Sequence, residues 1–213
     1  METHIQNIKC NNTVSHNSDL RGNYMQELHF KGTPQLETER LILRKLNLQD
    51  ENDLFEFDSD VEVSKFLSWD AHKSIDDTRN FINFVLGKYE RDEAGEWGIV
   101  LKENGKLIGT ISFVDYNIRN RRAEIGYVLS RKYWGQGIMP EALKRIIKFA
   151  FEEMGLNRIE CFHALENEKS GRVMQKVGMS FEGIVRERLY FKNKYWDAKL
   201  YAILRSDWIK QQG

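Results

Sequence analysis

The sequence predicts a mixed α/β fold of the α+β type, in which about four helices flank a mostly antiparallel sheet of about seven strands. Three observations support this prediction. Short segments with strand-like alternation dominate residues 97–129, with only turns between them. One strand–helix–strand unit follows, between residues 123 and 164. Two further strand-like segments end the chain. Because no internal repeat or linker divides these elements, we expect a single domain over residues 34–213.

Composition limits the classes of protein to which the chain can belong. Lys and Arg number 32, as do Asp and Glu, so the formal net charge is zero. Proteins that bind duplex nucleic acid are usually strongly basic, so a net charge of zero does not favour that class. Two cysteines and five scattered histidines give no disulfide framework and no zinc-ligand spacing, so we expect no metal. No secretion signal and no membrane-spanning apolar run is found, which predicts a soluble, cytoplasmic protein.

The first third of the chain predicts an extension, a strand and two helices. Residues 1–33 are rich in Asn, His, Ser and Thr and have no periodicity, which favours a flexible or loosely docked extension. One strand is expected over residues 36–46, because Leu41 and Leu43 share a face. An acidic helix should follow, and then a loop at residues 64–71. Ser74 can cap the second helix, which should reach about residue 91.

The remaining elements are predicted from alternation, turns and helix caps. Asn104-Gly105 is typical of a hairpin turn, and Gly155 can end a helix. Asn167 can cap a further helix, in which Ser170 lies on the apolar face. The strands are predicted over residues 97–101, 106–114, 123–129, 158–164, 183–191 and 196–204. The strand over residues 158–164 should lie parallel to the one over residues 123–129.

The segment Ala123–Glu141 combines a strand, a glycine-bearing loop and the first turn of a helix over residues 139–154. N–H groups at the start of a helix lack partners within the helix, and the helix dipole is positive there. Such a junction suits an anion such as phosphate or pyrophosphate. Gly135-Gln136-Gly137 lacks the third glycine of the dinucleotide-binding pattern, and the triphosphatase G-K-S or G-K-T is absent. The alternative is a turn that binds no ligand.

Motifs in the second half of the chain resemble the GNAT superfamily of N-acetyltransferases. The aromatic-Gly-Gln-Gly loop, preceded by Ala123-Glu124-Ile125-Gly126-Tyr127, resembles the acetyl-coenzyme A loop of that superfamily. Asn167-x-x-Ser170, followed by Val177-Gly178-Met179, resembles its next helix. Segments 36–44, 181–183 and 195–201 resemble, more narrowly, the ribosomal-protein N-terminal (alanine/serine) acetyltransferases and their relatives.

The resemblance implies a GNAT fold and direct attack of an amine on the thioester of acetyl-coenzyme A. It implies that the glycine loop holds the pyrophosphate, and that a backbone N–H such as that of Val128 polarises the thioester carbonyl. The pantetheine arm would pair with the strand edge like an added strand. The expected cofactor-binding residues are Tyr127, Val128, Leu129, Trp134, Gly135, Gln136, Gly137, Ile138, Met139, Asn167 and Ser170.

Two residues are candidates for catalysis. Glu124 lies on the same strand face as Gly126 and Val128, and its carboxylate could act as the base, directly or through water. The alternative is a solvated carboxylate paired with Arg121 or Arg122. Ser170 is the candidate acid or thiol contact. Its alternative role is a hydroxyl bonded back to a helix carbonyl.

Other residues depart from the family pattern or carry weaker signals. Lys132 stands where the loop commonly has Arg or Gln, and Met174 stands where many members have a tyrosine that protonates the thiolate. Phe66 and Trp69 could line the acceptor side, or simply pack. The candidates for contact with the 3′-phosphate are Arg131, Lys132 and Lys169. Cys161 is expected in the core.

The sequence therefore favours an acetyl-coenzyme A-dependent N-acetyltransferase that acts on a protein N-terminal amine. A small amine, such as a polyamine, an aminoglycoside or an amino-acid derivative, is the alternative acceptor. A non-catalytic module that senses acetyl-coenzyme A is a third possibility, from a different functional class. The sequence predicts neither nucleic-acid nor membrane partners, and it leaves the acceptor and dimerisation open.

Overall fold

A computed structural model of the protein describes residues 32–93 and 95–212. Its strands are β1 (Leu36–Glu37), β2 (Leu41–Lys45), β3 (Glu96–Leu101), β4 (Leu107–Asn117), β5 (Arg122–Leu129), β6 (Arg158–Ala164), β7 (Ser180–Phe191) and β8 (Lys194–Leu204). Its α-helices are α1 (Glu51–Asp58), α2 (Val61–Ser64), α3 (Ile75–Glu90), α4 (Ile138–Glu152), α5 (Glu168–Lys176) and α6 (Arg205–Gln212). Short 3-10 helices, η1 (Leu48–Asp50) and η2 (Arg131–Tyr133), precede α1 and the glycine loop.

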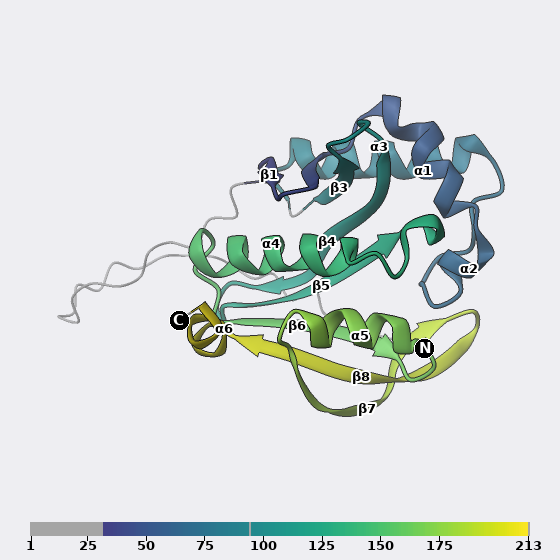
Figure 1. The fold of residues 1–213 in the computed structure, drawn as a ribbon. Helices are drawn as coiled ribbons and strands as arrows, with labels where there is room; N and C mark the ends of the chain where they lie inside the picture. Colours follow the sequence, from purple (N-terminus) through teal and green to yellow (C-terminus); the bar gives the residue numbers. More distant parts are fainter. Residues whose placement is uncertain (1–31, 94, 213) are drawn as a thin grey trace, which may run out of the picture.

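The strands form one eight-stranded sheet in the order β1-β2-β3-β4-β5-β6-β8-β7. Every neighbouring pair is antiparallel except β5 and β6, which are parallel because α4 connects them. Helices lie on both sides of the sheet (Figure 1). The larger apolar cluster lies beneath α4 and α5, and a second cluster lies between the opposite face and α1 and α3. The fold therefore has three layers.

The predicted α/β class and the parallel β5–β6 pair are confirmed, but two predicted elements at the ends of the domain were wrong. The expected strand over residues 36–46 is a tight hairpin of β1 and β2, in which the N–H of Thr38 donates to the carbonyl of Leu41. The chain ends in α6 rather than in a strand. None of its residues is buried, so no apolar stripe marks the helix in the sequence.

The predicted extension, residues 1–33, lies almost wholly outside the described residues. Thr33, at its end, is buried. Within the described ranges, no helix combines the length and the apolar character needed to cross a bilayer.

Strands β5 and β6 separate after a short junction. Only three residue pairs join them, the last of which is Glu124 with Glu160. On its other edge β5 stays paired with β4 as far as Leu129, and β6 stays paired with β8 as far as Ala164. The two strands therefore diverge, and the facing edges beyond Glu124 and Glu160 are left without a strand partner in the middle of the sheet.

Candidate active site

A cavity of about 1030 Å³ lies where β5 and β6 diverge. Its lining comes from β5, the loop before α4, the first turns of α5, the segment around α2, and β8. Most of the residues predicted to bind cofactor or acceptor line it, namely Phe66, Tyr127, Val128, Leu129, Trp134, Gly135, Gly137, Ile138, Met139, Asn167 and Ser170. Segments that are distant in sequence thus meet at one cavity, whereas Trp69 and Gln136, predicted with the others, do not line it.

The glycine loop has the conformation that an anion site needs. Gly135 and Gly137 have φ of 80° and 76°, in the left-handed region that glycine tolerates best. Gly137 is the N-cap of α4, so the first N–H groups of that helix have no partner within it. Ile138 and Met139 bury their side chains in the core, so they offer the cavity mainly their backbone. The loop therefore presents N–H donors rather than charged side chains.

Arg40 holds this loop from the other side. Its Nη1 donates to the carbonyl of Gln136 over 3.1 Å, and its Nε donates to Oε2 of Glu141 over 2.7 Å. Thr38 also donates to the Glu141 carboxylate, over 2.5 Å. Although burial opposes it, the hydrogen bonds from Thr38 and Arg40 lower the pKa of Glu141. Arg40 thus balances a carboxylate in the first turn of α4 that would otherwise repel a bound anion.

The hydrogen-bond register of β5 decides which amides face the cavity. The N–H of Ser130 donates to the carbonyl of Ile108 on β4 over 2.8 Å, and Val128 pairs with Thr110 on the same ladder. Because an antiparallel ladder alternates, the N–H of Val128 also faces β4, and those of Tyr127 and Leu129 face the open edge. The expectation that the Val128 amide polarises the thioester was therefore misplaced by one residue.

Tyr127 and Ser170 meet across the cavity. The tyrosine hydroxyl lies 2.8 Å from Oγ of Ser170 and 3.1 Å from the Ser170 carbonyl oxygen. Burial raises the pKa of Tyr127, so the phenol stays protonated at neutral pH. Asn167, the N-cap of α5, accepts from the N–H of Ser170 over 3.4 Å. Met174, which replaces the family tyrosine, is only 1 % exposed.

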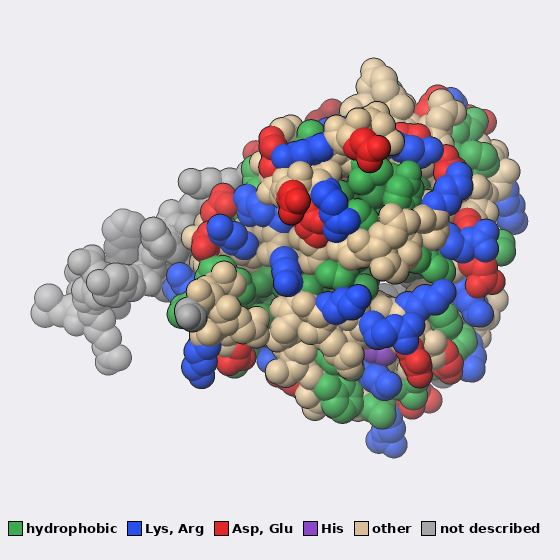
Figure 2. Space-filling view, viewed as in Figure 1, with side chains coloured by type: hydrophobic (Ala, Val, Ile, Leu, Met, Phe, Trp, Pro, Cys, Tyr) green, Lys and Arg blue, Asp and Glu red, His purple; other side chains and the backbone are tan. Residues whose placement is uncertain are grey.

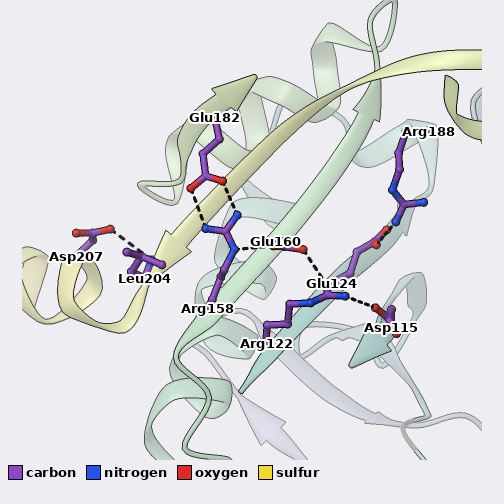
Figure 3. A network of polar contacts seen from close by, with 9 residues as sticks. All are labelled: Asp115, Arg122, Glu124, Arg158, Glu160, Glu182, Arg188, Leu204 and Asp207. Atoms are coloured by element: carbon purple, nitrogen blue, oxygen red, sulfur yellow. Dashed lines mark hydrogen bonds and ion pairs between the residues drawn. The ribbon is translucent and has the colours of Figure 1, made fainter. Parts of the chain in front are cut away.

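Glu124 lies beside the cavity, outside its lining, and next to a chain of ion pairs that it does not join (Figure 3). Its Oε2 accepts from Nη2 of Arg188 on β7 over 2.8 Å. Arg122, a partner expected from the sequence, instead pairs with Glu160 at 3.0 Å and Asp115 at 3.1 Å. Burial raises the pKa of Glu124, and the positive charge of Arg188 offsets part of this rise.

The two faces of the sheet divide the site. Tyr127 packs with the cluster beneath α4 and α5, whereas Val128 packs with the cluster beneath α1 and α3. Since side chains alternate along a strand, Glu124 shares the face of Val128. Ligand groups at the glycine loop and α5 would therefore lie on one side of the β5 edge, and Glu124 on the other.

The predicted acceptor aromatics are only partly at the cavity. Phe66 lines it and meets Trp196 of β8 edge to face, with ring centroids 6.4 Å apart. Trp69 does not line it and lies against His72, at 5.4 Å between centroids. From the sequence, Trp196 had no expected role beyond its place in segment 195–201 of the family resemblance. Its place beside Phe66 depends on how the β7–β8 hairpin folds over the segment after α2.

The three cations proposed for the 3′-phosphate differ in their surroundings. Arg131 pairs with Asp60 at 2.8 Å, and Lys132 pairs with Glu56 at 2.6 Å. Neither lines the cavity. Lys169 does, and its Nζ lies 4.2 Å from the centre of the Trp134 ring. Lys169 is therefore the best placed of the three.

Comparisons with known proteins identify the family. A family model described as "Acetyltransferase (GNAT) domain" matches residues 40–180. The chain belongs to this family. Among GNAT relatives, the "Uncharacterized N-acetyltransferase YoaA" of Bacillus subtilis is 33% identical over 81% of the chain and 97% of its own length. The "Ribosomal-protein-serine acetyltransferase" of Escherichia coli is 31% identical over 66% of the chain and 78% of its own length.

A solved structure supports the same GNAT fold. It is "RimL- Ribosomal L7/L12 alpha-N-protein acetyltransferase in complex with Coenzyme A", with a TM-score of 0.68, 23% identity, and coverage of 80% of this chain and 98% of that one. In the present chain, the sequence did not single out Arg40, which contacts the glycine loop, or Arg188, which pairs with Glu124. Both contacts join segments more than sixty residues apart. Among residues 32–93 and 95–212, no cluster of His, Cys, Asp and Glu that could hold a metal is found.

Proposed function

We propose that this acetyltransferase transfers the acetyl group of acetyl-coenzyme A to a protein N-terminal α-amine. One observation carries the proposal: the glycine loop, the open β5 edge and the Tyr127–Ser170 pair line a single cavity. The relatives named after ribosomal proteins support the choice of acceptor. When bound, the cosubstrate supplies an acetyl group activated as a thioester.

Binding would use backbone groups. The N–H groups from Gly135 to Met139 suit the pyrophosphate, because a helix N-terminus with left-handed glycines concentrates donors. The open edge at Tyr127 and Leu129 suits the amide-bearing pantetheine arm, which can pair as a strand does. One of these two N–H groups would donate to the thioester oxygen and stabilise its negative charge.

Two side chains would move protons. The acceptor ammonium must lose a proton before its nitrogen attacks the carbonyl carbon, and Glu124 would accept that proton, directly or through water. As the C–S bond breaks, the Ser170 hydroxyl would donate its proton to the sulfur and take another from water, while the attacking nitrogen releases its second proton to water. Tyr127 would orient that hydroxyl through their 2.8 Å hydrogen bond. Lys169, beside Trp134, would meet a phosphate of the cosubstrate.

The decisive assay measures free-thiol release from acetyl-coenzyme A across a panel of N-terminal peptides, polyamines, aminoglycosides and amino acids. Acetylation of peptide α-amines, located by mass spectrometry, supports the proposal. Turnover confined to small amines would show that the acceptor is a small amine and not a protein N-terminus. Binding of acetyl-coenzyme A in calorimetry without turnover on any amine would favour the sensor alternative. For Glu124→Gln, kcat equal to wild type at every pH would remove Glu124 as the base.

A further inference from the structure

Two lysines flank an aromatic pair at one end of the cavity. The aromatic pair is Phe66 with Trp196, and its rings meet edge to face. Nζ of Lys65 lies 5.5 Å from the centre of the Phe66 ring, and Nζ of Lys194 lies 4.1 Å from the centre of the Trp196 ring. All four residues line the cavity. We call them the aromatic–lysine subsite.

Trp196 of the subsite lies on the face of the sheet opposite the one that α5 covers. His163 of β6 stacks on Tyr201 of β8, and Gly171 of α5 lies against the same imidazole. These side chains therefore share the face that α5 covers. In β8, Trp196 has the opposite parity to Tyr201, so Trp196 points to the other face. That face also carries Glu124, the proposed base.

A separate contact holds the two halves of the subsite together. Lys192, at the tip of the β7–β8 hairpin, donates through Nζ to the carbonyl of Trp69 over 2.8 Å and forms an ion pair with Asp70. This contact ties the hairpin to the segment that follows α2. Lys65 and Lys194 come from these two elements, so the contact helps to hold their backbones on the same side of the cavity.

Both ammonium groups are available to a ligand. Among the described residues, Lys65 and Lys194 have no carboxylate within ion-pair distance, whereas Arg131, Lys132 and Arg188 are all paired. Both lysines are exposed. Lys and Arg outnumber Asp and Glu in the cavity lining, and basic side chains are visible on this face of the molecule (Figure 2). The cations of the lining are Lys65, Lys169, Arg172, Lys176 and Lys194, and its carboxylates are Glu62, Glu166 and Glu168. The local balance is therefore cationic, although the whole chain has a formal net charge of zero.

We propose that the aromatic–lysine subsite binds carboxylates of the acceptor, so that the preferred substrate is a peptide N-terminus followed closely by Asp or Glu. This inference rests on the proposed function. The rings would pack against the peptide backbone and exclude water, while the ammonium groups pair with its acidic side chains. A polyamine carries several positive charges, which Lys65 and Lys194 would repel. The same physics that favours acidic peptides thus disfavours this class of small amine.

The test compares three peptides that share the same first two residues and differ only at the next two, as Glu-Glu, Gln-Gln or Lys-Lys, with spermidine as a fourth acceptor. We expect kcat/KM to fall in the order Glu, Gln, Lys, with spermidine lowest. Higher ionic strength should reduce the advantage of the Glu-Glu peptide, because the two lysines are exposed. Equal kcat/KM for the three peptides, or preference for spermidine, would overturn the proposal.

Variants assign the effect to the subsite. Lys65→Gln and Lys194→Gln should each lower kcat/KM on the Glu-Glu peptide by about fivefold and leave the Gln-Gln peptide nearly unchanged. Lys144→Gln is the matched control, since Lys144 is exposed on α4 and lies outside the cavity lining. It should behave as wild type. A similar loss of kcat/KM on both peptides, or in the Lys144→Gln control, would show that Lys65 and Lys194 do not select the acceptor by its charge.

The experiment separates this inference from the proposed function. Acetylation of all three peptides without regard to charge would refute the subsite and leave the N-terminal acetyltransferase activity intact. If none of the peptides supports thiol release, both the proposed function and the aromatic–lysine subsite are refuted. Melting temperatures of the variants, measured beside wild type, check that each one folds.

Discussion

The hydroxyl of Tyr127 on β5 lies 2.8 Å from Oγ of Ser170 on α5. This hydrogen bond spans the place where β5 and β6 diverge, and it orients the only hydroxyl that α5 brings to the cavity lining. The same phenol lies 3.1 Å from the Ser170 carbonyl oxygen, so two contacts hold Tyr127 against the first turn of α5. A residue predicted only to bind the cofactor thus also supports the candidate acid.

Tyr127→Phe should lower kcat by about fivefold with little change in KM for acetyl-coenzyme A, because the Ser170 hydroxyl loses a partner worth about 1 kcal/mol. Steady-state kinetics checks this, and Ser170→Ala gives the comparison. If the two residues act as a unit, the double variant will be no slower than Ser170→Ala alone. Multiplied losses in the double variant would show that they act separately.

Arg188→Gln should move the acidic limb of the kcat–pH profile to higher pH. Burial raises the pKa of Glu124, and Arg188 is the largest influence that lowers it. Removal of that charge favours the protonated carboxyl, which cannot accept a proton, so activity should appear only at higher pH. A profile that superimposes on wild type would argue that Glu124 is not the titrating base.

Gly137→Ala should weaken acetyl-coenzyme A binding by about tenfold, because the change strains a φ of 76° and turns N–H donors away from the anion. Gly105→Ala is its control, since Gly105 has a similar φ of 72° in a hairpin with open space around it. Both variants should lose about 1 kcal/mol of stability in urea unfolding. Only Gly137→Ala should raise the Kd measured by calorimetry.

Asp58→Asn should flatten the dependence of stability on pH. Burial, together with the charge of Glu96, raises the pKa of Asp58 well above its ordinary value of 3.8. The folded state then holds a proton that the unfolded state releases, so the free energy of unfolding falls as pH rises from 3.8 through the raised pKa. Asparagine cannot titrate, and this contribution disappears. Urea denaturation of both proteins across that range measures the difference.

Local signals in the sequence predicted the parts of the site that depend on a few adjacent residues. Asn167 caps α5 as expected, because its side chain acts on the next turn of the same helix. The glycine loop was expected before α4, although the role of Gly137 as the N-cap was not predicted. The parity of β5 was also predictable, and it placed Glu124 on the face of Val128. Which amide of β5 faces the cavity could not be predicted, because it depends on the hydrogen-bond register between β5 and β4.

Long-range contacts could not be predicted. Arg188 reaches Glu124 because β7 bulges between Val185 and Leu189, with Glu187 at a φ of 52°. No residue pattern marks that bulge. Trp208 likewise packs on Phe151, and Gln211 donates to the carbonyl of Gly178, so contacts with distant segments hold α6 to the fold without an apolar stripe. Such contacts form only once distant segments have been brought together, so no local sequence pattern indicates them.

The brief junction of β5 and β6 has a mechanical consequence. At that point the sheet is two smaller sheets, β1–β5 and β6–β8, joined by three residue pairs. A ligand arm hydrogen-bonded along the open β5 edge would extend this seam with main-chain bonds, much as an inserted strand does. Occupancy would then strengthen the connection between the two halves, and amide hydrogens along the seam would exchange more slowly with solvent when the site is filled.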